Sequence, residues 1–255
     1  MPKKKEYPGR EVINKRFNNK RMHLIGSYHK NRKVMGIYSD AFDVFVDELK
    51  NRIKRKQQNV IIVDGDTGAG KSTLAIQIAI ALGKKLKQPF ELEKDYIYTL
   101  DDLWNKLQDP KASPISLIDE GSLLLNSKNA MSKENKDIVN LFNTMRSRGW
   151  STIVCVPSIF QIDKGVRTTH ADYRLHCSSE DHSLMRGYGR GFFEVSKAKR
   201  NEYSKDAEPY WMLQMTGVFG PLPDKIDAIY QPIKAEAQTR LIEGMIKRSR
   251  GEGET

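Results

Sequence analysis

The stretch NVIIVDGDTGAGKST, residues 59–73, decides the fold of this chain. It opens with an apolar, β-branched run, turns, and continues into a helix-forming segment. Four of its residues stand at the G-x-x-x-x-G-K-S spacing of a phosphate-binding P-loop, or Walker A motif: Gly65, Gly70, Lys71 and Ser72. The motif needs a strand before it and a helix after it, and the pattern predicts both. A glycine-rich turn that binds nothing is therefore the weaker interpretation.

Each residue type in this loop suits contact with ATP. Glycines let successive N–H groups converge on phosphate oxygens, and the positive end of the following helix adds to the attraction. Lys71 is expected to neutralise the β- and γ-phosphates, and the Ser72 hydroxyl to coordinate Mg²⁺, with Thr73 as a weaker alternative. The predicted nucleotide-binding residues are Gly65, Asp66, Thr67, Gly68, Ala69, Gly70, Lys71, Ser72 and Thr73.

A second apolar run, in SPISLIDEGSLLL at residues 113–125, leads directly into Asp119 and Glu120. This is the Walker B arrangement. Asp119 is expected to hold the Mg²⁺ shell through water, and Glu120 to orient or deprotonate the water that attacks the γ-phosphate. An acidic strand end means little alone. Together with the upstream P-loop it predicts hydrolysis of ATP rather than phosphate transfer to a small molecule.

Arginines supply further candidates for the active site. A helix predicted to end at Gly149 carries Arg146 and Arg148 in its last turn. Either arginine can simply complement the helix dipole, or it can act as a finger toward the γ-phosphate of a neighbouring subunit, with Arg146 preferred. Arg167 is a less favoured finger candidate.

Ser158 follows an apolar strand predicted over residues 151–157. Ligands of open α/β sheets bind at the carboxyl ends of the strands, so Ser158 is either a γ-phosphate sensor or a cap for its loop. A short strand at 95–98 is followed by Thr99, which can cap the next helix. Alternation of strands with helices favours right-handed crossovers and a mainly parallel sheet.

The C-terminal region is expected to add a last strand at residues 210–219 and a helix from Asp224 to Arg248, interrupted near Pro232. We expect three parts in the chain. They are a basic flexible arm (1–35), a P-loop ATPase core (36–200) and a C-terminal strand and helix extension (201–255).

The charge of the chain is concentrated in the arm. The net charge is +11, and residues 1–35 hold eleven Lys/Arg against two acidic residues. The remaining 32 basic and 30 acidic residues nearly cancel. Aromatic residues lie between these cations, so the arm can neutralise nucleic-acid phosphates and stack on bases; a solvated leader or localisation tag is the equal alternative.

Two cysteines give no disulfide framework, which fits a reducing cytoplasm. No apolar run is long enough to cross a bilayer, and the charged N-terminus has no apolar core after it. The expected location is therefore cytoplasmic, which means the host cytoplasm if the protein is viral.

The order GDTGAGKS, LIDEG and RSRG, with a strand that ends in VPS, resembles the additional-strand, catalytic-glutamate division of P-loop ATPases. Within it the chain is similar to FtsK/HerA-type and zonula occludens toxin-like ATPases of viruses, phages and plasmids. The resemblance implies an α/β, RecA-like sheet with the sensor strand between the P-loop and Walker B strands. It also implies a homo-oligomeric ring, often hexameric, that moves double-stranded DNA. Two features depart from the family: Ser158 replaces the usual Gln, and the transmembrane helix of zonula occludens toxin-like proteins is missing.

The leading hypothesis is a Mg²⁺-dependent, oligomeric ATPase of a mobile genetic element or virus that translocates or packages DNA. The alternative is an ATP-gated assembly or switch protein that acts on partner proteins without moving DNA. A metabolite kinase is disfavoured, because a water-activating carboxylate at Glu120 promotes hydrolysis.

Overall fold

The computed structural model of this 255-residue chain describes residues 37–38, 41–119, 133–178, 191–200 and 208–249. The predicted basic arm, residues 1–35, and Glu120 lie outside the described residues. The strands are β1 (Ile37–Tyr38), β2 (Asn59–Gly65), β3 (Tyr96–Ile97), β4 (Ile115–Ile118), β5 (Ser151–Cys155), β6 (Tyr173–Ser178), β7 (Gly191–Lys199) and β8 (Tyr210–Phe219). The helices are α2 (Phe42–Lys54), α3 (Lys71–Leu86), α4 (Leu92–Asp95), α5 (Leu100–Gln108), α7 (Lys133–Arg148) and α9 (Asp224–Ser249), with short turns η3 (Ile159–Gln161) and η4 (Val166–His170).

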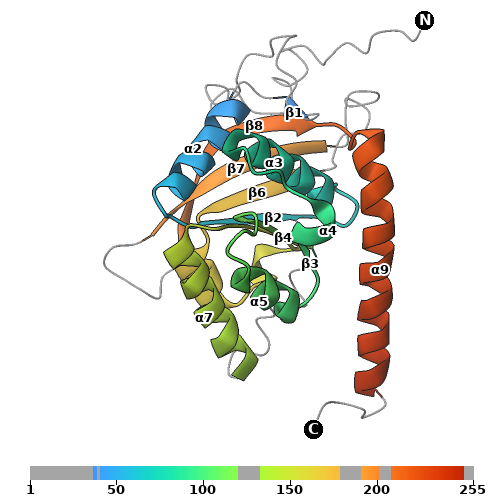
Figure 1. Ribbon diagram of the computed structural model, residues 1–255. Helices are drawn as coiled ribbons and strands as arrows, with labels where there is room; N and C mark the ends of the chain where they lie inside the picture. The colour runs from blue at the N-terminus through green and yellow to red at the C-terminus, as the bar shows by residue number, and fades with distance from the viewer. Residues whose placement is uncertain (1–36, 39–40, 120–132, 179–190, 201–207, 250–255) are drawn as a thin grey trace, which may run out of the picture.

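Within the described ranges, eight strands form one sheet in the order β1-β8-β7-β6-β2-β5-β4-β3 (Figure 1). The strands β6, β2, β5, β4 and β3 run parallel, whereas β7, β8 and β1 join antiparallel. β5 lies between the P-loop strand β2 and the strand β4 that leads to Asp119. The predicted α/β class and the inserted position of the 151–157 strand are therefore confirmed.

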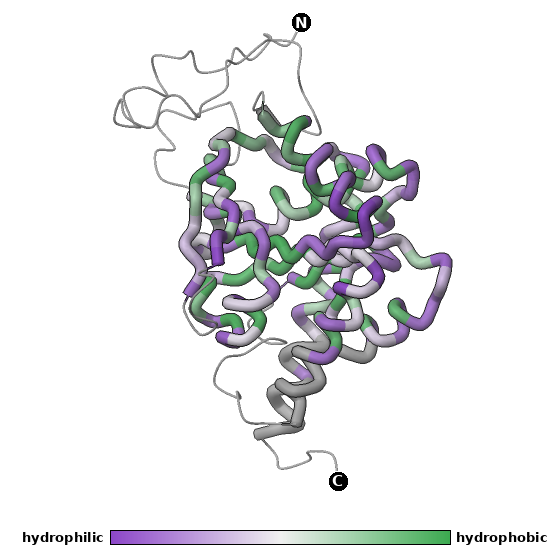
Figure 2. The backbone as a smooth tube through the Cα atoms, turned by 90° about the vertical axis from the view of Figure 1, so that its left-hand side faces the viewer, coloured by the Kyte–Doolittle hydropathy of each residue, from purple (hydrophilic) through white to green (hydrophobic). Residues whose placement is uncertain are grey.

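The sheet separates two layers of helices because successive side chains of a strand point to opposite faces. On β2, Ile61 and Val63 pack into the core cluster that includes α2 and α3, whereas Val60 and Ile62 pack into the cluster with α5 and α7. All four side chains are fully buried. Figure 2 shows hydrophobic segments running through the centre of the molecule. A strand covered on both faces reads as a continuous apolar run, which is what residues 59–63 show.

Several local predictions match the structure. Thr99 forms a capping box at the start of α5: its hydroxyl accepts from the Asp102 N–H at 3.1 Å, and the Asp102 carboxylate accepts from the Thr99 N–H at 2.9 Å. α7 ends at Arg148, directly before Gly149. β8 has the bounds predicted for the last strand. Short-range signals of this kind depend on neighbours in sequence, so the sequence alone reveals them.

The predicted interruption of the C-terminal helix near Pro232 is wrong. α9 continues through Pro232 and runs past one end of the strands, beside α4 and β3 (Figure 1). Proline removes one helical hydrogen bond, but anchors on both sides hold the helix in place. Tyr230 is buried in the core, and the Tyr98 hydroxyl donates to the Ile233 carbonyl oxygen at 3.0 Å.

Candidate nucleotide-binding site

The loop between β2 and α3 has the backbone that the P-loop motif requires. Gly65 has a φ of 139°, and a Cβ atom at this position would lie 2.2 Å from the carbonyl oxygen of Cys177 on β6. Gly70, with a φ of 88°, is the N-cap of α3 and offers no side chain to its first N–H groups. No acidic residue lies in the first turn of α3. The positive end of this helix is therefore available to an anion.

Lys71 lies folded back over the loop. Its Nζ donates to the carbonyl oxygens of Gly65 at 2.8 Å and Asp66 at 2.9 Å. Both acceptors are neutral, so an anionic phosphate oxygen that replaces either of them adds attraction between opposite charges to the hydrogen bond. The geometry keeps the ammonium group at the loop, where the sequence predicted it.

Ser72 and Asp119, predicted to hold the metal ion, are brought together across the sheet edge. The Ser72 hydroxyl donates to Asp119 Oδ1 at 3.0 Å. A hydroxyl and a carboxylate are the hard oxygen ligands that Mg²⁺ prefers, so this pair fits the ion. The glycine loop, Lys71 and the free helix end fit the phosphates of ATP in the same way.

Two tyrosines outside the P-loop and Walker B motifs complete the surroundings of Asp119. Tyr96 and Tyr230 donate their hydroxyl protons to Asp119 Oδ2 at 2.7 Å and 3.2 Å. Burial, and next the Asp119 charge, raise the pKa of both phenols above the usual value of 10, so both remain donors at neutral pH. Tyr230 stands 111 residues from Asp119 in the sequence, and no local pattern indicates the contact.

A pocket of about 420 Å³ opens between the P-loop and α9. One wall consists of loop and α3 residues, the floor of Asp119 and the end of β5, and the other wall of α9 residues. The lining residues are Thr67, Gly68, Gly70, Lys71, Ser72, Thr73, Asp119, Cys155, Val156, Pro157, Asp227, Tyr230, Gln231, Lys234 and Gln238. Most of the predicted nucleotide-binding residues thus share one cavity, while Glu120 falls outside the described chain.

The buried carboxylate of Asp64 fixes the end of β2 just before the loop. Arg174 Nη2 donates to it at 2.7 Å, and His176 Nδ1 lies 3.0 Å from its other oxygen. Burial acts to raise the pKa of Asp64, but the hydrogen bonds from His176 and Arg174 outweigh burial and lower it. The hydrogen bond between His176 and Asp64 also raises the pKa of His176.

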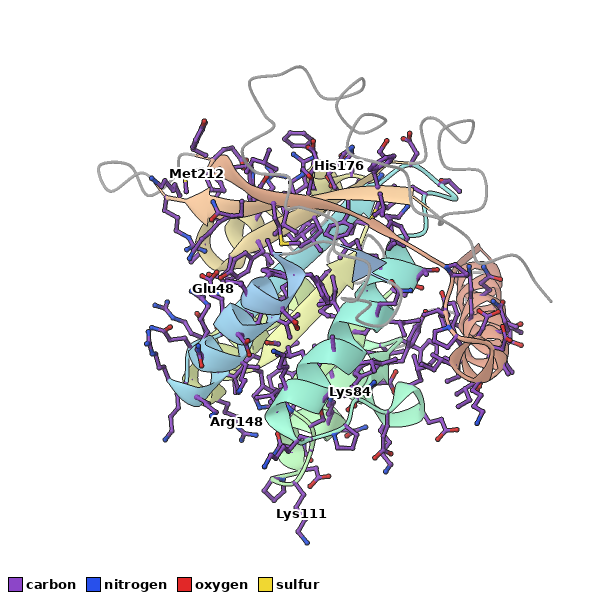
Figure 3. All side chains as sticks on the ribbon, turned by 90° about the horizontal axis from the view of Figure 1, so that it is seen from above. Glu48, Lys84, Lys111, Arg148, His176 and Met212 are labelled. Carbon is purple, nitrogen blue, oxygen red and sulfur yellow. The ribbon has the colours of Figure 1, made fainter. Side chains whose placement is uncertain are left out.

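The predicted arginine fingers lie away from the P-loop of their own chain. α7 leads into β5 at Ser151, which pairs with Asn59 and Ile115, the first residues of β2 and β4. The P-loop follows the opposite end of β2. Arg146 and Arg148 therefore lie at the other sheet edge, and Figure 3 shows Arg148 well separated from His176.

Two of the arginines have intramolecular partners. The Arg148 guanidinium donates to the Leu107 carbonyl at the end of α5. Arg167 pairs with Glu208 and also donates to the Ile159 and Ile162 carbonyls, which gives it a structural role. Arg146 is exposed on α7, and a role in a neighbouring subunit stays a prediction.

Ser158 caps the turn η3. Its Oγ accepts a hydrogen bond from the Phe160 N–H at 3.4 Å, and Ser158 does not line the pocket beside the P-loop. The geometry therefore shows the loop cap that was one of its two predicted roles. Contact with a γ-phosphate stays a prediction.

One family model matches the part of the chain that holds these residues. Residues 45–161, which include the P-loop, Asp119 and Ser158, match the family model described as Novel STAND NTPase 3. The chain resembles the P-loop NTPases. No curated protein matches it.

Among solved structures, the N-terminal domain of zonular occludens toxin from Neisseria meningitidis is 15% identical, with 67% of this chain and 97% of that chain covered and a TM-score of 0.39. The genome packaging NTPase B204 from Sulfolobus turreted icosahedral virus 2, in complex with AMP, is 14% identical, with 66% and 99% covered and a TM-score of 0.40. No helix in the described part of the chain is long and apolar enough to cross a membrane.

Proposed function

We propose that this protein is a Mg²⁺-dependent ATPase that works as a homo-oligomer and moves or packages double-stranded DNA for a virus or mobile genetic element. The hydrolytic part of the proposal rests on one contact, the 3.0 Å hydrogen bond between Ser72 and Asp119 beside the Lys71 loop. Motif residues 47 positions apart in the sequence meet at one pocket. This convergence is what a hydrolytic P-loop site needs.

The side chains divide the work as follows. The loop N–H groups and Lys71 bind and orient the phosphates, and the α3 N-terminus favours their negative charge. Ser72 and Asp119 would hold Mg²⁺, and the bound ion would neutralise charge that develops on the phosphate oxygens. Glu120, one residue beyond Asp119, orients the attacking water and accepts its proton. Tyr96 and Tyr230 fix the Asp119 carboxylate through Oδ2, so that Oδ1 faces Ser72.

The DNA and oligomer parts of the proposal have sequence support. Residues 1–35 concentrate the positive charge of the chain, and a basic arm of this kind neutralises phosphates. The position of Arg146 at the far sheet edge allows contact with the nucleotide of a neighbouring subunit and excludes contact with its own. The described neighbours also include a genome packaging NTPase of a virus.

The test of hydrolysis compares wild type with Glu120→Gln. The variant is expected to bind ATP within about threefold of wild type, whereas turnover falls at least about 100-fold because the water loses its base. Glu93→Gln, on the exposed surface of α4, is the matched control and should hydrolyse ATP like wild type. Equal turnover in Glu120→Gln and wild type would show that Glu120 is not the base.

Addition of duplex DNA at low salt should raise wild-type turnover, and an unchanged rate would remove the DNA part of the proposal.

An ATP-gated assembly or switch protein is the second candidate, and one contact favours it. Tyr230 of the C-terminal helix donates directly to Asp119, so events at the metal site reach α9. This function predicts ATP-dependent assembly that rises with protein concentration, with slow turnover that DNA leaves unchanged. Solution mass measured with and without ATP separates the two candidates.

A further inference from the structure

One face of α9 forms the wall of the nucleotide pocket opposite the P-loop. Asp227, Tyr230, Gln231, Lys234 and Gln238 line the cavity together with Thr67, Gly68 and Lys71. Asp227, the adjacent pair Tyr230 and Gln231, Lys234 and Gln238 recur at intervals of three or four residues along α9, the spacing that places side chains on one side of a helix. The wall is therefore a regular surface of α9 and not a chance contact at its end.

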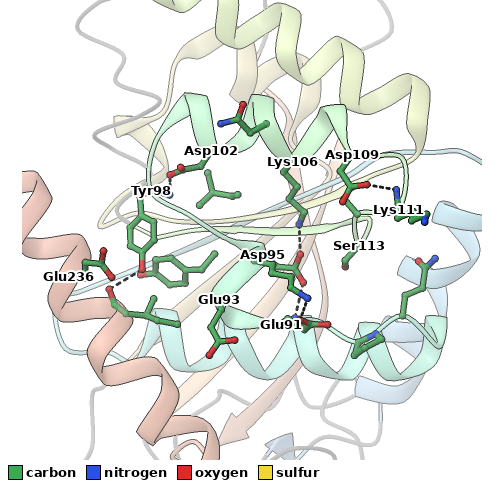
Figure 4. A pocket seen from close by; sticks show the side chains of 18 of the residues that line it. Glu91, Glu93, Asp95, Tyr98, Asp102, Lys106, Asp109, Lys111, Ser113 and Glu236 are labelled. Atoms are coloured by element: carbon green, nitrogen blue, oxygen red, sulfur yellow. Dashed lines mark hydrogen bonds and ion pairs between the residues drawn. The ribbon is translucent and has the colours of Figure 1, made fainter.

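The start of α9 is tied to the helix that follows the P-loop. Gln77 on α3 donates through Nε2 to the carbonyl oxygens of Gly220 at 3.0 Å and Pro221 at 3.2 Å, directly before α9. Farther along, the Tyr98 hydroxyl donates to the Ile233 carbonyl oxygen, a contact visible in Figure 4. Two separate attachments thus hold α9 at a fixed distance from the loop.

Tyr230 and Lys234 connect this wall to Asp119. The Tyr230 side chain is buried, with its hydroxyl 3.2 Å from Asp119 Oδ2. The Lys234 Nζ lies 5.9 Å from the centroid of the Tyr230 ring, within the range of a cation–π contact. This contact holds the ammonium group beside the pocket, above the ring that reaches the metal-site carboxylate.

The charge of Lys234 is not neutralised by its acidic neighbour on the same face. Asp227 accepts a hydrogen bond from Gln231 Nε2 at 2.9 Å, and the contact that the described residues show for the Lys234 ammonium group is the one with the Tyr230 ring. Lys71 approaches the cavity from the loop, and Lys234 from the helix. A triphosphate carries several negative charges, so two cations on opposite walls suit it better than one.

We propose that α9 is the second wall of the nucleotide site and that Lys234 binds the phosphates of a nucleoside triphosphate from the side opposite Lys71. The inference rests on the proposed nucleotide-binding function and adds a residue outside the P-loop and Walker B motifs. Tyr230 is the positioning residue, because it supports both Asp119 and the ammonium group of Lys234.

The experiment measures equilibrium binding of a fluorescent ATP analogue to the full chain with Mg²⁺ present. Lys234→Ala is expected to weaken binding about tenfold, the effect of one charge-assisted contact. Lys234→Arg keeps the cation and should bind within about threefold of wild type. Lys225→Ala removes the same charge from an exposed position of α9 that does not line the pocket, and should bind like wild type. Thermal melting without nucleotide should be the same for all three variants.

The outcomes separate this inference from the function on which it rests. If wild type binds ATP and Lys71→Ala does not, but Lys234→Ala binds as tightly as wild type, the role of Lys234 is overturned and the P-loop site stands. Equal weakening in Lys225→Ala and Lys234→Ala would also overturn it, because the effect would then be general electrostatics. If wild type does not bind ATP, both the proposed function and this inference fail.

Discussion

Two clusters at opposite ends of the parallel strands, one around Arg52 and Asp172 and the other around Lys71 and Asp119, hold their charged side chains in different ways. Where the strands begin, Arg52 forms an ion pair with Asp172 at 2.9 Å and donates to Asn59 Oδ1 at 2.7 Å. Asp172 also accepts from the Val60 N–H at 3.1 Å. Where the strands end, Lys71 rests on carbonyl oxygens, and hydroxyl groups donate to Asp119.

The comparison shows how similar residues serve two purposes. An ammonium or guanidinium group paired with a carboxylate inside the protein is fixed, because removal of either partner leaves an uncompensated charge. A cation held by neutral carbonyls can exchange them for a more strongly negative ligand at little cost. The first arrangement stabilises the fold, and the second leaves the site ready for a ligand.

The largest expected effect is the loss of ATP turnover when Lys71, held by neutral carbonyl oxygens, is removed. Lys71→Ala should reduce ATP turnover at least about 100-fold, because the phosphates lose their main positive partner. Its free energy of unfolding should change by less than about 1 kcal/mol, since only two loop carbonyls lose a donor. ATPase assays and urea denaturation check the two parts. Lys54→Ala, at the exposed end of α2, is the control. A large loss of stability in Lys71→Ala would remove the distinction between the two clusters.

The opposite pattern is expected for Asp172→Asn. The side chain is only 13% exposed, so the loss of its charge leaves Arg52 without its carboxylate partner and should lower the free energy of unfolding by about 2 kcal/mol. Affinity for ATP should stay within about twofold of wild type, because the residue lies at the opposite end of the strands from the P-loop. Denaturation curves and fluorescent-nucleotide titration provide the measurements. Weaker ATP binding without any loss of stability would contradict the comparison.

The smallest effect concerns His176, an ionic partner near the P-loop. Its hydrogen bond with Asp64 raises its pKa above the usual 6.5, so the protonated ring stabilises the fold. This contribution is fully present below pH 6.5 and is lost as the pH rises through the raised pKa. The stability difference between wild type and His176→Gln should therefore shrink from pH 5.5 to pH 8.5. With the side chain 46% exposed, the change should stay below about 1 kcal/mol.

The variant difference is the quantity to measure, because His170 titrates in the opposite sense. Burial lowers its pKa to about 4, so its contribution is lost as the pH falls. Wild-type stability alone would mix the two histidines. A difference between wild type and His176→Gln that stays constant across this range would show that the imidazole does not gain charge on folding.

Much of the fold and the two motifs of the site could be predicted from short stretches of the sequence. The P-loop, the strand before Asp119 and the cap at Thr99 each depend on residues within a few positions of one another. The meeting of Ser72 and Asp119 followed from the parallel sheet, whose strand ends share one edge. These features are local or follow from one topological rule.

The remainder depends on the path of α9, which no local pattern specifies. Tyr230 and Lys234 face the pocket because Gln77 and Tyr98 hold that helix in place, and the same anchors explain why Pro232 does not break it. The sequence around Arg167 allowed the prediction of an arginine finger. The structure pairs Arg167 with Glu208, which lies 41 residues away in the sequence and could not be identified from it. Long-range contacts of this kind override local propensity.

The close approach of Gly65 to Cys177 has a consequence for mutagenesis. Gly65 is needed for the pairing of β2 with β6 as well as for phosphate binding. Any larger residue would push β6 away from β2. A substitution of Gly65 is thus expected to disturb the pairing of β2 with β6, so its effect on nucleotide binding cannot be separated from an effect on folding. Lys71 has no comparable role in strand pairing, so a substitution there tests nucleotide binding more directly.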